Sequence, residues 1–104
     1  MTFDQYQDET QRTSSNDVSL IVCALGLCGE SGEIADHIKK AVAQGHELDT
    51  EKIAYELGDI CWYISQAARA IDMKLSDVID MNVEKLRKRY PNGFEAERSI
   101  HRGE

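Results

Sequence analysis

Two acidic pairs are the residues in this sequence with the clearest chemical potential. Glu30 is followed three positions later by Glu33, and Glu56 by Asp59. Residues three apart project from one side of an α-helix, so each pair would place both carboxylates on one face. Apolar residues recur at helical spacing around both pairs and are expected to form buried stripes: Leu27, Ile34, Ile38 and Val42 around the first, and Ile53, Leu57, Ile60 and Ile64 around the second. Glu30 and Glu56 fall within these rows. We therefore expect these two carboxylates to point towards the interior.

Carboxylates that converge inside a protein must be neutralised, because like charges repel and buried charge is costly. They can share protons, pair with Lys or Arg, or bind a cation. An all-oxygen ligand set suits Mg²⁺, Mn²⁺ or Ca²⁺ and disfavours zinc, which prefers His and Cys. A single pair would indicate an ordinary solvated helix face. Two pairs in register with apolar rows favour a metal site.

A polar and basic row near the C-terminal end could complement the acidic pairs. Asn82, Lys85 and Arg89 lie beside the apolar stripe of a helix that should end before Pro91. Alone, such cations indicate a solvated face favoured by the helix dipole, and Lys39 near the end of an earlier helix has the same explanation. Together with the acidic pairs, these four polar residues are candidates for binding phosphate. Metals at the acidic pairs would screen the phosphates and help to ionise an attacking water.

Hydrophobic periodicity predicts the elements that must position these residues. We expect an all-α fold, a helical bundle of about four helices over residues 3–12, 16 or 17 to about 44, 51–71, and 76–90. The expected N-terminal signals are Thr2 with Gln5 as a capping box, Asn16 or Asp17, Asp49 or Thr50, and Ser76.

The 104 residues predict one domain, 1–104, with residues 95–104 as a loosely ordered or partner-bound tail. A monomer of this size buries only about two thirds of its unfolded surface, so we expect oligomerisation to complete the core.

The net charge is −7, from 19 acidic and 12 basic residues, which argues against binding a nucleic acid polymer. A small polyphosphate differs, because a divalent metal can bridge it to carboxylates. No apolar run is long enough to cross a membrane, and the first residues lack the basic and apolar regions of a signal peptide. We therefore expect a cytoplasmic protein that does not bind membranes.

Three stretches, Leu27–Asp36, Glu56–Tyr63 and Asn82–Phe94, together resemble the MazG-type nucleotide pyrophosphohydrolases. These enzymes belong to the all-α NTP pyrophosphatase superfamily, whose motif is E-x-x-E, a spacer, then E-x-x-D. The resemblance extends from about residue 20 to 94. It implies a hydrolase that cleaves a nucleoside triphosphate between its α and β phosphates, with Mg²⁺ or Mn²⁺, to the monophosphate and pyrophosphate.

The resemblance also implies roles for the acidic residues. Glu30, Glu33, Glu56 and Asp59 match the metal-binding positions. Glu33, or else Glu30, would be the catalytic group that orients the attacking water.

Further roles come from the same resemblance. Asn82 and Lys85 match an N-x-x-K element that Arg89 and Tyr90 continue, so all four would contact phosphate or sugar. The family forms dimers or dimers of dimers that share a helical bundle, which implies a homodimer or homotetramer. Base contacts often come from the N-terminal helix and a neighbouring subunit. Candidates for contacts with base or sugar are Tyr6, Trp62 and Tyr90, although Trp62 also fits a core position.

Other functions are compatible with parts of this pattern. A ferritin-like di-iron site needs Glu-x-x-His pairs, and none of His37, His46 and His101 has a Glu three residues before it. A phosphoribosyl-ATP pyrophosphohydrolase carries similar acidic pairs. A helical nucleotide-binding module without turnover is the non-enzymatic alternative, although the four intact acidic positions favour an enzyme. The preferred base and sugar stay open.

Overall fold

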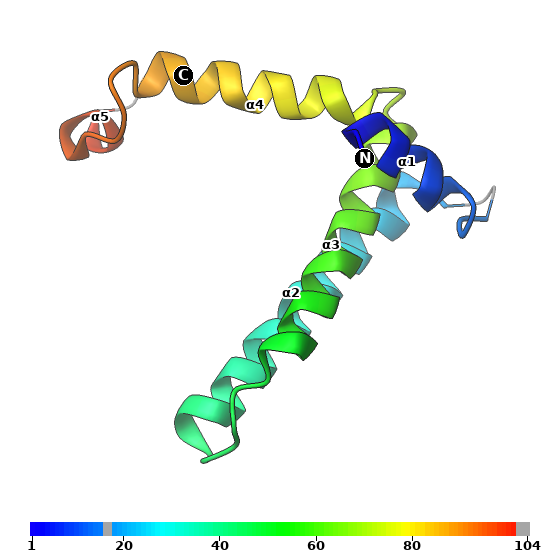
Figure 1. The fold of residues 1–104 in the computed structure, drawn as a ribbon, viewed down its shortest axis with the longest axis vertical. Helices are drawn as coiled ribbons and strands as arrows, with labels where there is room; N and C mark the ends of the chain where they lie inside the picture. Colours follow the sequence, from blue (N-terminus) through cyan, green and yellow to red (C-terminus); the bar gives the residue numbers. More distant parts are fainter. Residues whose placement is uncertain (16–17, 102–104) are drawn as a thin grey trace.

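The structure is a computed structural model that describes residues 1–15 and 18–101 (Figure 1). The described residues form helices and no strands, which confirms the predicted all-α class. The helices are α1 (Phe3–Gln11), α2 (Leu20–Ala43), α3 (Thr50–Ala70), α4 (Leu75–Arg89) and α5 (Ala96–Ile100). No helix in these ranges is both long enough and apolar enough to span a membrane.

The two longest helices, α2 and α3, lie side by side as an antiparallel hairpin. Helix α1 and the start of α4 pack against the end of the hairpin where α3 finishes. From there α4 runs away from the hairpin and ends in the short α5 (Figure 1). The connection between α2 and α3 lies at the opposite end.

Two of the four predicted helix starts, those of α1 and α3, follow the predicted capping signals. The backbone amide of Gln5 donates to Thr2 Oγ1 at 3.0 Å, and the backbone amide of Thr2 donates to Gln5 Oε1 at 2.7 Å. These two bonds form the predicted capping box. Asp49 caps α3 by accepting the Lys52 amide at 3.1 Å. The cap of α2 is Ser19. The caps expected at positions 16 and 17 lie outside the described residues.

The start of α4 differs from the prediction that Ser76 opens the helix. The N-cap position is Lys74, whose side chain makes no capping hydrogen bond. Side chains of α1 cap this helix instead. Asp4 accepts the Ser76 amide at 3.1 Å and the Ser76 hydroxyl at 2.9 Å, and Gln7 Oε1 accepts the Leu75 amide at 2.9 Å. The bonds from Ser76 lower the pKa of Asp4, so the two helices are joined by a charge-assisted contact.

Helix α1 is joined to α3 by a small buried polar network. Thr10 is 3% exposed, and its hydroxyl lies 2.8 Å from the Ser65 hydroxyl. The side-chain amide of Gln66 donates from Nε2 to Thr10 Oγ1 at 3.0 Å, and the Thr10 hydroxyl donates to the backbone carbonyl of Gln7 at 2.8 Å. Each buried group therefore has a partner, as buried polar groups require.

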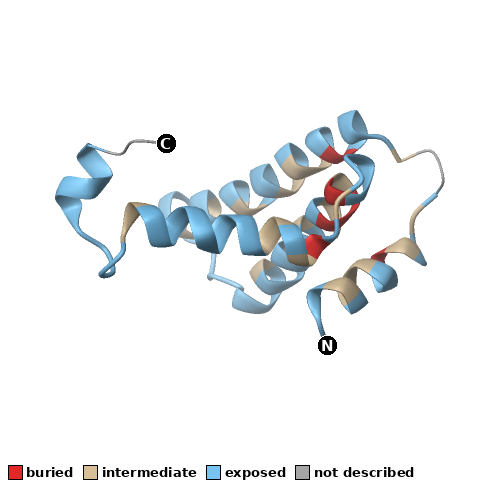
Figure 2. Ribbon diagram, turned by 90° about the horizontal axis from the view of Figure 1, so that it is seen from above, coloured by how far each residue is buried: buried red, intermediate tan, exposed pale blue. Residues whose placement is uncertain are grey.

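Few residues of the single chain are buried, and those few gather at the end of the hairpin where α1 and α4 begin (Figure 2). The prediction of continuous buried stripes is wrong for several positions. Val42 is 82% exposed, Leu57 52% and Ile38 42%. Two helices that pack along one line can cover only the side chains facing that line, so the remaining apolar side chains stay uncovered in one copy.

The hairpin helices pack closely at Gly26. A Cβ atom at this position would overlap the ring of Tyr63 on α3, whereas one at Gly29 would meet nothing within 4 Å. Helix-interior glycine costs about 1 kcal/mol relative to alanine. At Gly26 the close packing of α3 offsets that cost, and at Gly29 the described residues provide no such contact.

These two glycines should therefore respond oppositely to alanine. We expect Gly26→Ala to lower the free energy of unfolding by about 1–3 kcal/mol through overpacking against Tyr63. Gly29→Ala should raise it by about 1 kcal/mol through helix propensity. Urea denaturation at one fixed protein concentration measures both. Equal stability of Gly26→Ala and the wild type would contradict the packing argument.

Candidate metal centre between the hairpin helices

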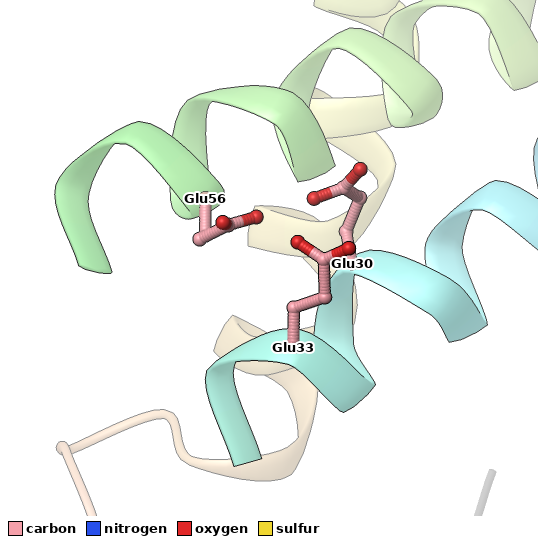
Figure 3. Close-up of side chains that lie close together, drawn as sticks. All are labelled: Glu30, Glu33 and Glu56. Carbon is pink, nitrogen blue, oxygen red and sulfur yellow. The ribbon is translucent and has the colours of Figure 1, made fainter. Parts of the chain in front are cut away.

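Three of the predicted acidic residues converge in the hairpin. Glu30 and Glu33 extend from α2 and Glu56 from α3 towards one another, and one carboxylate oxygen from each lies within 4.8 Å of the others (Figure 3). Glu30 and Glu56 are half-buried and Glu33 is exposed. The i, i+3 spacing on α2 places its two carboxylates on one face, and the antiparallel packing brings Glu56 opposite them.

The proximity of these carboxylates makes them harder to ionise. The pKa of Glu33 is raised, chiefly because its protonated form can donate a hydrogen bond to Glu56 and because the Glu56 charge repels its own. The pKa of Glu56 is raised chiefly because its protonated form can donate to Glu30, and also by desolvation. A nearby cation would favour the ionised forms and reverse these shifts.

The donor atoms present fit a hard divalent cation. Glu30 Oε2 and Glu56 Oε2 are inaccessible to solvent and have no hydrogen-bond partner in the described part of the chain. Buried oxygens of this kind need a proton, a donor or a metal. A cluster made only of carboxylates is the set that Mg²⁺ or Mn²⁺ prefers.

The fourth predicted ligand, Asp59, lies outside this group of three but near it. Its charge contributes to the raised pKa of both Glu33 and Glu56. It also contributes to the raised pKa of Tyr6 on α1, where burial is the largest cause. Asp59 therefore stays a predicted metal ligand on the α1 side of the cluster.

A polar pocket of about 490 Å³ opens beside the cluster, towards the connection between α2 and α3. Its lining combines two cluster carboxylates with two glycines, an aspartate, a histidine and two lysines: Gly29, Gly32, Glu33, Asp36, His37, Lys40, Lys52 and Glu56. Neither glycine would bring a Cβ within 4 Å of another group, so both leave the pocket wall open.

The lysines that line this pocket differ from the predicted one. Lys39 does not line it, and its Nζ lies 3.3 Å from Asp36 Oδ1. Lys40 lines the pocket and also pairs with Asp36, at 2.9 Å. Lys52 was missed by the sequence reasoning. Its position four residues before Glu56 places both side chains on one face of α3, which is the signal that could have indicated it.

The predicted phosphate-binding residues of α4 are not brought to the cluster within one chain. Asn82, Lys85 and Arg89 belong to α4, the helix that runs away from the hairpin (Figure 1). The Tyr90 ring packs against Phe94 with ring centroids 5.5 Å apart, also at the far end of α4.

The other two aromatic candidates occupy different environments. Tyr6 lines an apolar pocket of about 730 Å³ between α1, α3 and α4, which Gly58 and Cys61 also line. Trp62 is half-buried, and its Nε1 donates to Thr13 Oγ1 at 2.8 Å. Its ring meets Tyr63 edge-on at 5.1 Å. Of the two, Tyr6 is the one that lies beside a pocket and Asp59.

The helical fold and the acidic cluster together define an all-α protein with a carboxylate site suited to a divalent metal. Residues 20–94 match the model of the MazG nucleotide pyrophosphohydrolase domain, so the chain belongs to this family. Membership supports a nucleotide pyrophosphohydrolase type of function and a metal-dependent site.

The chain is also similar to the Gene 37 protein of Mycobacterium phage L5, at 38% identity over 73 residues. The match covers 66% of this chain and 64% of that protein, so it spans less than two thirds of the relative's length. No solved structure gives a significant match.

The raised pKa values predict how the metal-free protein responds to pH. The folded state holds protons on Glu33 and Glu56 more tightly than the unfolded state, where a glutamate has a pKa of about 4.3. The stability associated with these protons is complete below that value and is lost as pH rises through the raised pKa values. The free energy of unfolding should therefore fall as the pH rises from about 4 to about 7.

Urea denaturation in EDTA at several pH values measures this fall. Glu56→Gln removes one of the charges and should flatten it, whereas Glu47→Gln, an exposed charge in the connection, should not. Added Mg²⁺ should restore wild-type stability at pH 7. A slope that Glu56→Gln leaves unchanged would show that the cluster does not cause the pH dependence.

Proposed function

We propose that the protein hydrolyses nucleoside or deoxynucleoside triphosphates between the α and β phosphates, releasing the monophosphate and pyrophosphate. The observation that carries this proposal is the convergence of Glu30, Glu33 and Glu56 on facing helices of a MazG family member. The acidic cluster alone would repel a triphosphate. A Mg²⁺ ion held by these carboxylates, with Asp59 as a further ligand, would turn that repulsion into binding.

When bound, Mg²⁺ would supply charge neutralisation at the phosphates and a lowered pKa for water. Within the chain, Glu33 is the proposed proton acceptor. It is the exposed member of the cluster and lines the polar pocket, so a water in that pocket can reach it. Water would add its oxygen to phosphorus, its proton would pass to Glu33, and the α–β anhydride bond would break.

The first test is a panel of ribo- and deoxynucleoside triphosphates, with and without Mg²⁺ or Mn²⁺, in which all products are resolved. Monophosphate with pyrophosphate, formed only with metal, is the expected outcome. Diphosphate with orthophosphate would contradict the proposed bond cleavage. Turnover of phosphoribosyl-ATP alone would identify the related pyrophosphohydrolase, and nucleotide binding without turnover would identify a non-catalytic module.

Removing single charges from the cluster should abolish turnover without unfolding the protein. We expect Glu33→Gln and Glu56→Gln each to lower kcat by at least about 100-fold, the range of a lost general base. Both should stay folded, because each relieves repulsion in the metal-free state. Glu47→Gln is the matched control, and circular dichroism checks the fold. Activity within about threefold of wild type in either cluster variant would rule out the assigned site.

We further propose that the active form is a homodimer or homotetramer in which α4 of one copy reaches the acidic cluster of another. Two observations support this arrangement. Asn82, Lys85 and Arg89 lie on a helix that leaves its own hairpin, and apolar side chains of α4 and of the hairpin remain exposed: Leu57, Met81, Val83 and Leu86. Burial of these side chains between copies would stabilise the assembly.

A complementation experiment tests whether the site is shared. Arg89→Ala and Glu33→Gln should each be inactive as pure proteins. If they assemble together, a mixed dimer holds one site in which both parts are intact, so an equal mixture should recover about a quarter of wild-type activity. The mixture is unfolded and refolded together, and separately refolded samples are the control. Failure of the mixture to recover activity, with subunit exchange shown by mass spectrometry, would contradict a shared site.

A further inference from the structure

Lys52 is a cation placed at the polar pocket by the first two turns of α3. It lines the same pocket as Glu33 and Glu56, so its charged side chain lies beside the cluster without being part of it. The family resemblance and the sequence motifs assign no role to this residue.

Among the lysines at this end of the hairpin, Lys52 is the one available to a ligand. Lys39 and Lys40 both contact Asp36, at 3.3 and 2.9 Å. Within residues 1–15 and 18–101, the Lys52 ammonium forms no ion pair. A lysine at a pocket mouth without a carboxylate partner can offer all three of its N–H donors to an anion.

The backbone at Lys52 is held in place by a chain of hydrogen bonds from α2. The Asp49 amide donates to His37 Nε2 at 2.9 Å, and Asp49 Oδ1 accepts the Lys52 amide at 3.1 Å. The connection between the helices is thereby tied back to α2 at the pocket wall. Binding a ligand to Lys52 needs ordering of its side chain only, which limits the entropic cost.

Two pockets of different polarity lie beside the cluster, and each suits a different end of a nucleotide. Towards the connection, the pocket that contains Lys52 is polar; towards α1, the pocket beside Gly58 and Tyr6 is apolar. Glu56 lines the first pocket and Gly58, two residues further along α3, lines the second. An anionic pyrophosphate group suits the end with Lys52 and does not suit the apolar end.

We propose that Lys52 binds the β and γ phosphates of the substrate and holds the pyrophosphate leaving group. The proposal rests on the proposed function and deepens it, because it assigns the terminal phosphates to the pocket at the α2–α3 connection. Lys52 neutralises part of the charge that develops on pyrophosphate as the anhydride bond breaks. Its contribution should therefore be larger for pyrophosphate than for the nucleoside monophosphate.

The test compares the binding of the two products by isothermal titration calorimetry with Mg²⁺. Lys52→Gln should weaken pyrophosphate binding by about tenfold or more, the effect of losing one charge-assisted contact, and change monophosphate binding by less than about twofold. Lys88→Gln, which removes an exposed lysine of α4 paired with Glu84, is the matched control and should change neither. Lys52→Arg keeps the charge and should recover most of the pyrophosphate affinity.

The outcomes separate this proposal from the proposed function. Wild-type pyrophosphate affinity in Lys52→Gln, or an equal loss for both products, would overturn the role of Lys52 even if the wild type hydrolyses nucleotides. Absence of pyrophosphate release from any nucleotide by the wild type would overturn the proposed function. In that case the loss of pyrophosphate affinity in Lys52→Gln would still support an anion site at Lys52.

Discussion

The structure depends on holding three glutamate carboxylates together against their mutual repulsion. Oxygens of Glu30, Glu33 and Glu56 lie within 4.8 Å of one another, and two of these residues carry raised pKa values as a result. A pair of helices free to separate would relieve this repulsion. The hairpin must therefore be fixed on both sides of the cluster, and the contacts that fix it lie at its two ends.

On one side, α2 and α3 approach so closely at Gly26 that the ring of Tyr63 occupies the space of a side chain. On the other side, the bond from the Asp49 amide to His37 ties the connection back to α2. Between them the helices have small or absent side chains at Gly29 and Gly32, so the cluster borders a pocket rather than a packed core. The same arrangement that creates the repulsion also leaves space for a cation and a substrate to relieve it.

Local sequence patterns were sufficient to predict what depends on one helix at a time. The i, i+3 spacing of the acidic pairs and the apolar rows through Glu30 and Glu56 predicted the cluster. The cap at Thr2 was predicted, and Asp49 was one of the two caps predicted for α3, because capping is a contact between near neighbours. The cap of α4 by Asp4, from 72 positions away, had no local signal. The predicted burial at Val42 also failed, because periodicity identifies an apolar face but not whether the same chain covers it.

The two pockets beside the cluster differ in polarity, and this difference gives the proposed site its direction. The protein carries a net charge of −7, so an approaching polyanion meets repulsion almost everywhere. The polar pocket brings two positive charges beside the carboxylates, that of Lys52 and that of Lys40, which is paired with Asp36. The pocket near Tyr6 offers apolar surface instead. A single triphosphate with one bound metal is short enough to keep its charges next to the cluster and Lys52, in line with the nucleoside triphosphate proposed as substrate.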